Sequence, residues 1–127
     1  MTDRGDIERL VSELHAARLA ADLQRLCALF RPDARLRIIG SSEGKPIAIV
    51  AEGLEQIRTW LGMLIKTFRL SGYERLSTVI EDERAAVHWR VHIRSRITGR
   101  LVPTELVDLI EARGAHIASH TELFVPF

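Results

Sequence analysis

The sequence has few of the features that mark secreted, fibrous or nucleic-acid-binding proteins. Its single cysteine, Cys27, cannot form an internal disulfide, which indicates a reducing compartment. With only 4 prolines and 8 glycines among 127 residues, the composition excludes collagen-like and disordered chains. The 18 basic residues are balanced by 17 acidic ones, so no excess of positive charge is available to bind a nucleic-acid backbone.

Long apolar runs are absent as well. The first residues, MTDRGDIERL, are mixed in charge, and no stretch approaches the roughly 20 apolar residues of a membrane span. We therefore expect a cytoplasmic protein with neither a signal peptide nor a membrane partner. Apolar residues make up 46% of the chain, which is enough for a packed core, and the length fits one domain, 1–127.

Helical periodicity dominates the first half of the chain. Apolar residues spaced i, i+3, i+4 and i+7 predict helices over 7–14, 23–30 and 57–68. Asp22 can cap the start of the second helix, and Pro32 is expected to end it. The pair Ser71-Gly72 provides a stop for the third.

The second half is rich in strand-forming residues. Alternating and apolar stretches separated by turn residues predict strands at 35–39, 47–51, 73–80, 85–97, 101–112 and 116–125. Helices that precede a run of hairpin-linked strands indicate an α+β fold, in which the helices cover one face of a curved, mostly antiparallel sheet.

Four segments, in this order, carry a resemblance to a known family. They are LAADLQRLCALFRPDARLRIIG, AEGLEQIRTWLG, AAVHWRV and DLIEARGAHIASHTELFV. Together they resemble the nuclear transport factor 2-like superfamily, and within it the SnoaL-like polyketide cyclases and their ketosteroid isomerase relatives. The resemblance covers nearly the whole chain. It implies a cone of bent sheet and long helices around a pocket that is open at one end.

The resemblance also implies a catalytic pair. SnoaL-like sequences commonly carry an Asp in the penultimate strand and a His in the last strand, and these positions are Asp108 and His120 here. His120 would act as the general acid/base and Asp108 would orient it. Ketosteroid isomerases have a catalytic Asp and a Tyr where this chain has Ile38 and Leu14, so steroid isomerase chemistry is disfavoured.

The loop between the last two strands decides whether this pair can meet. A three-residue loop, Arg113 to Ala115, would set Asp108 directly opposite His120 on one face of the sheet. A two-residue loop, Gly114-Ala115, would instead set Asp108 opposite Thr121 and separate the pair to opposite faces. The resemblance favours the three-residue loop.

Further residues are candidates for the pocket wall. Glu122 lies on the same side of its strand as His120 and would add a second carboxylate. The expected apolar lining consists of Leu14, Ile38, Trp60, Trp89, Leu106, Ile110 and Phe124. No cofactor is expected, because no dinucleotide or phosphate loop is present. No metal site is expected either, because the histidines spaced four apart, at 88 and 92 and at 116 and 120, lie on strands and are about 13 Å apart.

These observations favour a SnoaL-like enzyme that performs acid/base chemistry on a small, largely apolar carbonyl compound. The alternative is a non-catalytic ligand-binding or dimerisation module of the same fold. An open cavity of roughly 300 Å³ or more with Asp108 and His120 on its wall would favour the enzyme, and a filled interior would favour the module. Alternating His and Arg residues over 88–96 form either a solvated outer face or half of a homodimer interface, and many relatives pair there.

Overall fold

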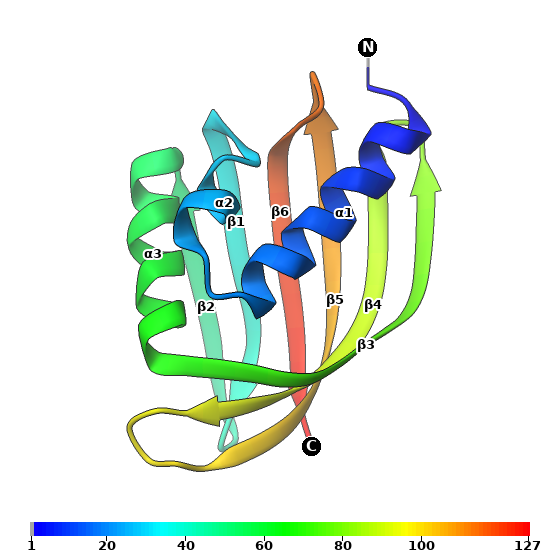
Figure 1. The fold of residues 1–127 in the computed structure, drawn as a ribbon. Coiled ribbons are helices and arrows are strands. Elements are labelled where there is room, and N and C mark those ends of the chain that lie inside the picture. Colours follow the sequence, from blue (N-terminus) through cyan, green and yellow to red (C-terminus); the bar gives the residue numbers. More distant parts are fainter. Residues whose placement is uncertain (1) are drawn as a thin grey trace.

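The computed structural model describes residues 2–127, which form three helices and six strands (Figure 1). The elements in chain order are α1 (Arg4–Leu19), α2 (Leu23–Cys27), β1 (Phe30–Ser42), β2 (Lys45–Glu52), α3 (Leu54–Thr67), β3 (Phe68–Glu81), β4 (Arg84–Ser95), β5 (Leu101–Arg113) and β6 (His116–Pro126). None of the helices in this part of the chain is long and apolar enough to cross a membrane.

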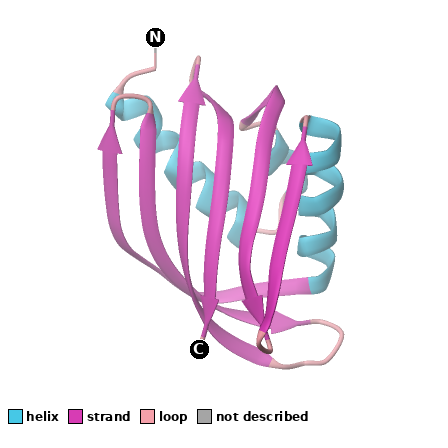
Figure 2. Ribbon diagram, turned by 180° about the vertical axis from the view of Figure 1, so that it is seen from behind, coloured by secondary structure: helices cyan, strands magenta, loops and turns pink. Residues whose placement is uncertain are grey.

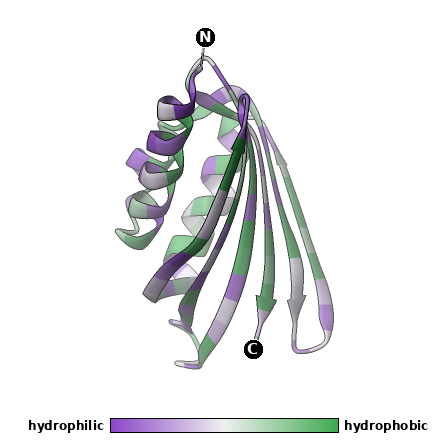
Figure 3. Cartoon of the chain, turned by 90° about the vertical axis from the view of Figure 1, so that its right-hand side faces the viewer, coloured by the Kyte–Doolittle hydropathy of each residue, from purple (hydrophilic) through white to green (hydrophobic). Residues whose placement is uncertain are grey.

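The strands form one mixed sheet in the order β2-β1-β6-β5-β4-β3. Neighbouring strands run antiparallel except for β1 and β6, which are parallel. All three helices lie on one face of this curved sheet, and the other face is uncovered (Figures 2 and 3). The α+β architecture predicted from the order of the elements is therefore confirmed. The core fills the space between the two layers.

The helix α1 has the local features that its sequence predicts. Asp3 and Asp6 form a capping box, in which each side chain accepts a hydrogen bond from the other's backbone N–H. The apolar residues of 7–14 are buried against the sheet, where α1 packs on β3 and β4. Ala21 then adopts a φ of +54°, which turns the chain, and Asp22 caps α2 by accepting from the Arg25 N–H.

Two predicted helix ends are wrong, and sheet pairing explains both. The second helix ends at Cys27 instead of Phe30, because Phe30 pairs with Ile117 at the start of β1. Pro32 consequently lies in β1, where the register is irregular. The third helix ends at Thr67, and Ser71-Gly72 forms part of a bulge in β3.

Candidate functional site

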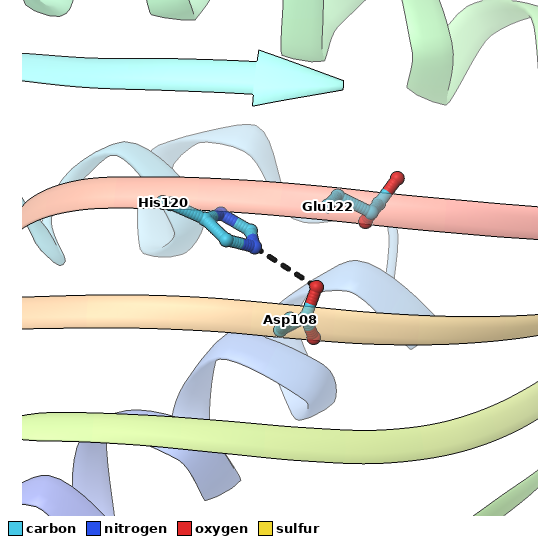
Figure 4. Close-up of side chains that lie close together, drawn as sticks. All are labelled: Asp108, His120 and Glu122. Atoms are coloured by element: carbon cyan, nitrogen blue, oxygen red, sulfur yellow. Dashed lines mark hydrogen bonds and ion pairs between the residues drawn. The ribbon is translucent and has the colours of Figure 1, made fainter. Parts of the chain in front are cut away.

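A chain of buried polar side chains crosses the core between α1 and the sheet. The carboxylate of Asp108 on β5 lies 2.9 Å from Nε2 of His120 on β6 and 2.7 Å from Nε2 of His15 on α1. Nδ1 of His15 lies 2.6 Å from the hydroxyl oxygen of Tyr73 on β3. Asp108, His120 and His15 are all fully buried. Figure 4 shows the imidazole of His120 turned toward Asp108 on the neighbouring strand.

The hairpin that brings Asp108 and His120 together differs from the predicted one. Arg113 pairs with His116, so the loop has two residues, Gly114-Ala115, with φ of +60° and +62° as in a type I′ turn. The expected three-residue loop is therefore wrong. A regular ladder from this turn would place His120 on the outer face of the sheet.

A β-bulge near the turn returns His120 to the inner face. Ala112 pairs with Ile117 and Glu111 with Ser119, so Ala118 is an extra residue in β6. Beyond the bulge, Ile110 lies opposite His120 and Asp108 lies opposite Glu122. Asp108 and His120 are thus diagonal neighbours on the same face, where their side chains can reach each other.

The surroundings of Asp108 favour its ionised form. Burial, the strongest single influence, opposes ionisation, but the charge and hydrogen bond of His120 and the hydrogen bond of His15 outweigh it, so the pKa of Asp108 lies well below its usual range. An ionised carboxylate can only accept, so both Nε2 atoms donate to it. In neutral imidazoles Nδ1 is then the acceptor, and His15 can accept from the Tyr73 hydroxyl.

Two buried polar atoms within residues 2–127 have no hydrogen-bond partner, namely His120 Nδ1 and Trp89 Nε1. The indole of Trp89 packs against the His15 ring, with 4.5 Å between the ring centroids. Apolar packing of this kind keeps water away from the Asp108 carboxylate, which strengthens its hydrogen bonds with the two imidazoles.

An ion pair lies next to this row of buried polar side chains. Arg18, near the end of α1, donates from a guanidinium nitrogen to Glu122 Oε1 at 2.6 Å, and both side chains are almost completely buried. Burial disfavours the charged guanidinium, but the charge of Glu122 and its hydrogen bond outweigh that effect and raise the pKa of Arg18. Arg18 and Glu122 therefore form a buried ion pair.

A cavity of about 510 Å³ opens beside this ion pair. It lies between the sheet and the carboxyl ends of α1 and α3, and its wall is largely apolar. Arg18 and Glu122 both line it, and Thr104 adds a hydroxyl group. Arg69 and Arg96, which are exposed, complete the charged groups of the lining. The lining thus combines two exposed arginines with a buried Arg–Glu pair.

The structure divides the predicted site residues into two groups. Ile38, Leu106, Glu122 and Phe124 line the cavity. The others, which are absent from its lining, are the buried Leu14, Trp89, Asp108, Ile110 and His120 and the half-buried Trp60. The cavity therefore meets the minimum of roughly 300 Å³ expected for an enzyme, but Glu122 lies on its wall and Asp108 and His120 do not. Their part in catalysis stays a prediction.

Three residues of this region were missed by the sequence interpretation. His15 and Arg18 follow Val11 by four and seven residues, so the helical period of the buried face includes both. Polar residues that share the helical spacing of the buried apolar residues were the signal that could have identified His15 and Arg18. Tyr73 lies on β3, and no local pattern links it to His15.

The donor atoms of Asp108, His120 and Glu122 lie within 4.8 Å of one another, which is close enough for a metal ion (Figure 4). Both carboxylates already have cationic or N–H partners, however. The Arg18 guanidinium at Glu122 supplies the positive charge that a metal ion would provide. The donor set is therefore better suited to ion pairing than to metal binding.

Comparison with known proteins places this architecture in a family. The model of the SnoaL-like domain family matches residues 7–120. The chain belongs to the SnoaL-like family. The resemblance seen in the four sequence segments is thereby confirmed. No curated protein matches this SnoaL-like chain.

Solved structures show the same fold at low sequence identity. A presumed isomerase from Bacillus subtilis superposes with a TM-score of 0.83 at 17% identity, covering 98% of this chain and 89% of the other. An NTF2-like protein from Burkholderia xenovorans LB400 gives 0.79 at 20% identity, with 98% and 92% coverage. A protein with a ketosteroid isomerase-like fold from Catenulispora acidiphila, in complex with trimethylamine, gives 0.73 at 16% identity, with 89% and 82% coverage.

Proposed function

We propose that this SnoaL-like protein is a cofactor-independent acid/base catalyst acting on a small, largely apolar carbonyl compound. The observation that carries the proposal is the Arg18–Glu122 pair on the wall of an apolar cavity of about 510 Å³. A cavity of this size accepts a ligand of two or three rings. A buried carboxylate beside a fixed cation is a common arrangement for moving a proton next to a carbonyl group.

Glu122 is the proposed base. Its Oε1 accepts from Arg18, whereas Oε2 makes no hydrogen bond within residues 2–127 and has a lone pair available for a substrate proton. The proton moves from the carbon next to the carbonyl to Oε2, and the electron pair of the broken C–H bond passes to the carbonyl oxygen. Where a carbon–carbon double bond adjoins the deprotonated carbon, the electron pair returns from the oxygen through the conjugated dienolate, and the protonated Glu122 delivers its proton to the far carbon of that bond, which completes an isomerisation.

Arg18 is the proposed partner of the developing oxyanion. A guanidinium has five N–H donors, and only one of its nitrogens is engaged with Glu122 in the structure. The remaining donors can hydrogen-bond the carbonyl oxygen as it gains negative charge, and the surrounding apolar wall strengthens that interaction.

Asp108 and His120 enter this proposal as positioning residues. Asp108 pairs with Glu122 across β5 and β6, and His120 precedes Glu122 by two residues on the same face of β6. The Asp108 carboxylate holds the imidazole of His120 by its Nε2 atom. Locked in this way, the pair fixes the strand segment from which Glu122 reaches the cavity.

Deuterium exchange into β-tetralone, a neutral two-ring ketone, tests the proposal. We expect the protein in D₂O to accelerate exchange at the carbons next to the carbonyl, as followed by NMR. Glu122→Gln should lower this rate at least about 100-fold, because the loss of a general base costs 10²–10⁴-fold. Glu105→Gln is the matched control, since Glu105 pairs with His88 on the uncovered face of the sheet and is far less buried.

An unchanged exchange rate in Glu122→Gln would contradict the proposed role of this residue. If β-tetralone binds but no protein-dependent exchange occurs, the non-catalytic ligand-binding module becomes the better description. The absence of Asp108 and His120 from the cavity wall is the observation that favours that second candidate.

A further inference from the structure

We infer that the ligand of this cavity carries an anionic group, which Arg69 and Arg96 bind at the exposed end. The inference rests on the proposed function in placing the ligand in the same cavity. It adds the substrate class, an apolar carbonyl compound with an acidic substituent such as a carboxylate.

The first argument is the charge of the cavity wall. The lining contains three arginines, Arg18, Arg69 and Arg96, but only one acidic residue, Glu122. Glu122 is already paired with Arg18 at 2.6 Å. Neither Arg69 nor Arg96 has a carboxylate within ion-pair distance among residues 2–127. The lining therefore carries two uncompensated positive charges, although the whole chain is almost neutral.

The second argument is the arrangement of the strands at this end. Arg69 pairs directly with Arg94 across β3 and β4, so two like charges are opposite each other in the ladder. Such a pair is unfavourable unless a counter-charge is present. Arg94 donates only to the backbone oxygen of Gly99, which leaves its positive charge unneutralised. Arg94 is absent from the cavity lining, so its charge would act on an anion bound at Arg69 only by raising the local positive potential.

The third argument is the division of the cavity by exposure. Arg69 and Arg96 are exposed, whereas Arg18 and Glu122 are almost completely buried. Apolar side chains such as Ile93, Leu106 and Phe124 line the same cavity. A ligand that matches these three parts of the wall has an anionic group near water, an apolar body and a neutral carbonyl group at the buried Arg18–Glu122 pair. A guanidinium suits a carboxylate, which it can hold by two hydrogen bonds.

Two fluorescent probes that differ in one charge test the inference. Anilinonaphthalenesulfonate carries a sulfonate, and its parent phenylnaphthylamine has the same apolar body without the charge. We expect the folded protein to bind the sulfonate about five times more tightly than the neutral probe at low salt, because one partly solvated ion pair contributes about 1 kcal/mol. Added sodium chloride should narrow this difference.

Substitutions test which arginines cause the preference for the sulfonate probe. Arg69→Gln and Arg96→Gln should each weaken binding of the sulfonate about threefold and leave the affinity for phenylnaphthylamine unchanged. Arg37→Gln is the matched control, because Arg37 is exposed and its neighbour Ile38 points to the cavity from the opposite face of β1. It removes the same charge from the protein and should leave both affinities unchanged.

Equal affinity for the two probes, or equal losses in Arg37→Gln and Arg69→Gln, would overturn the inference. Circular dichroism of each variant shows whether the fold is retained, and all three arginines are exposed, so their replacement leaves the core intact. Failure of the proposed function would look different, because the sulfonate preference would persist while no deuterium exchange into β-tetralone occurred.

Discussion

At the scale of single residues, the buried Asp108 carboxylate is held from two sides. Each of its oxygens is within hydrogen-bond distance of an imidazole nitrogen, and its side chain is 1% exposed. Asparagine at this position can accept with one oxygen only and presents an NH₂ group to the other imidazole. We expect Asp108→Asn to lower the free energy of unfolding at neutral pH by about 3 kcal/mol, as measured by urea denaturation.

The pH dependence of that loss is a separate prediction. The folded pKa of Asp108 is depressed, so the unfolded chain binds the proton more readily. The stabilisation is therefore complete above the unfolded pKa of about 4 and is lost as the pH falls below it toward the folded pKa. Between about pH 5 and pH 3 the stability difference between wild type and Asp108→Asn should shrink. Asp33→Asn is the control, since Asp33 is exposed, and a constant difference for Asp108→Asn would contradict the prediction.

Parts of the candidate site could be predicted from individual residues. Asp108 and His120 were candidates through the family resemblance, and Glu122 was a candidate because it shares a side of its strand with His120; the structure places all three close together. The exclusion of Asp108 and His120 from the cavity wall could not be predicted, because it depends on where α1 packs. His15 and Arg18 project from that helix and contact Asp108 and Glu122, respectively.

At the scale of elements, the hairpin between β5 and β6 has a strand register that local sequence patterns do not predict. Loop length alone predicts one of two registers, and neither is the observed one. The bulge at Ala118 adds a residue to β6, and it depends on the pairing of Ile117 with both Phe30 and Ala112. The helix ends at Cys27 and Thr67 were misplaced for the same reason, since long-range strand pairing outweighs local periodicity.

The turn of this hairpin yields a prediction on stability. Ala115 has a φ of +62°, a conformation that costs a non-glycine residue about 1 kcal/mol. Ala115→Gly should therefore raise the free energy of unfolding by about 0.5–1 kcal/mol, after the entropy lost by glycine is deducted. Gly114→Ala, at a φ of +60°, should lower it by a similar amount. Urea denaturation of both variants measures the effects, and a loss of stability in Ala115→Gly would refute the explanation.

At the scale of the whole molecule, the sheet has two unlike faces. The face under the helices holds the core, the buried polar chain and the cavity wall. The opposite face is uncovered in Figure 2 and exposes apolar residues of the two central strands, including Leu109, Leu123 and Val125. Ion pairs between His88 and Glu105 and between Arg90 and Glu74 lie beside them. An apolar centre with a charged border is typical of an interface between protein chains.

We expect this face to form a homodimer, as the alternating His and Arg residues of β4 suggested. A stable dimer buries about 800 Å² on each partner, and an arginine at the centre of such a contact would be buried without a counter-charge. Leu123→Arg should therefore dissociate the dimer at micromolar concentration in sedimentation velocity. Ile97→Arg, in the exposed loop after β4, introduces the same side chain away from this face and should leave the dimer intact. A wild-type protein that sediments as a monomer at these concentrations would count against the interface, and equal dissociation of both variants would place it elsewhere.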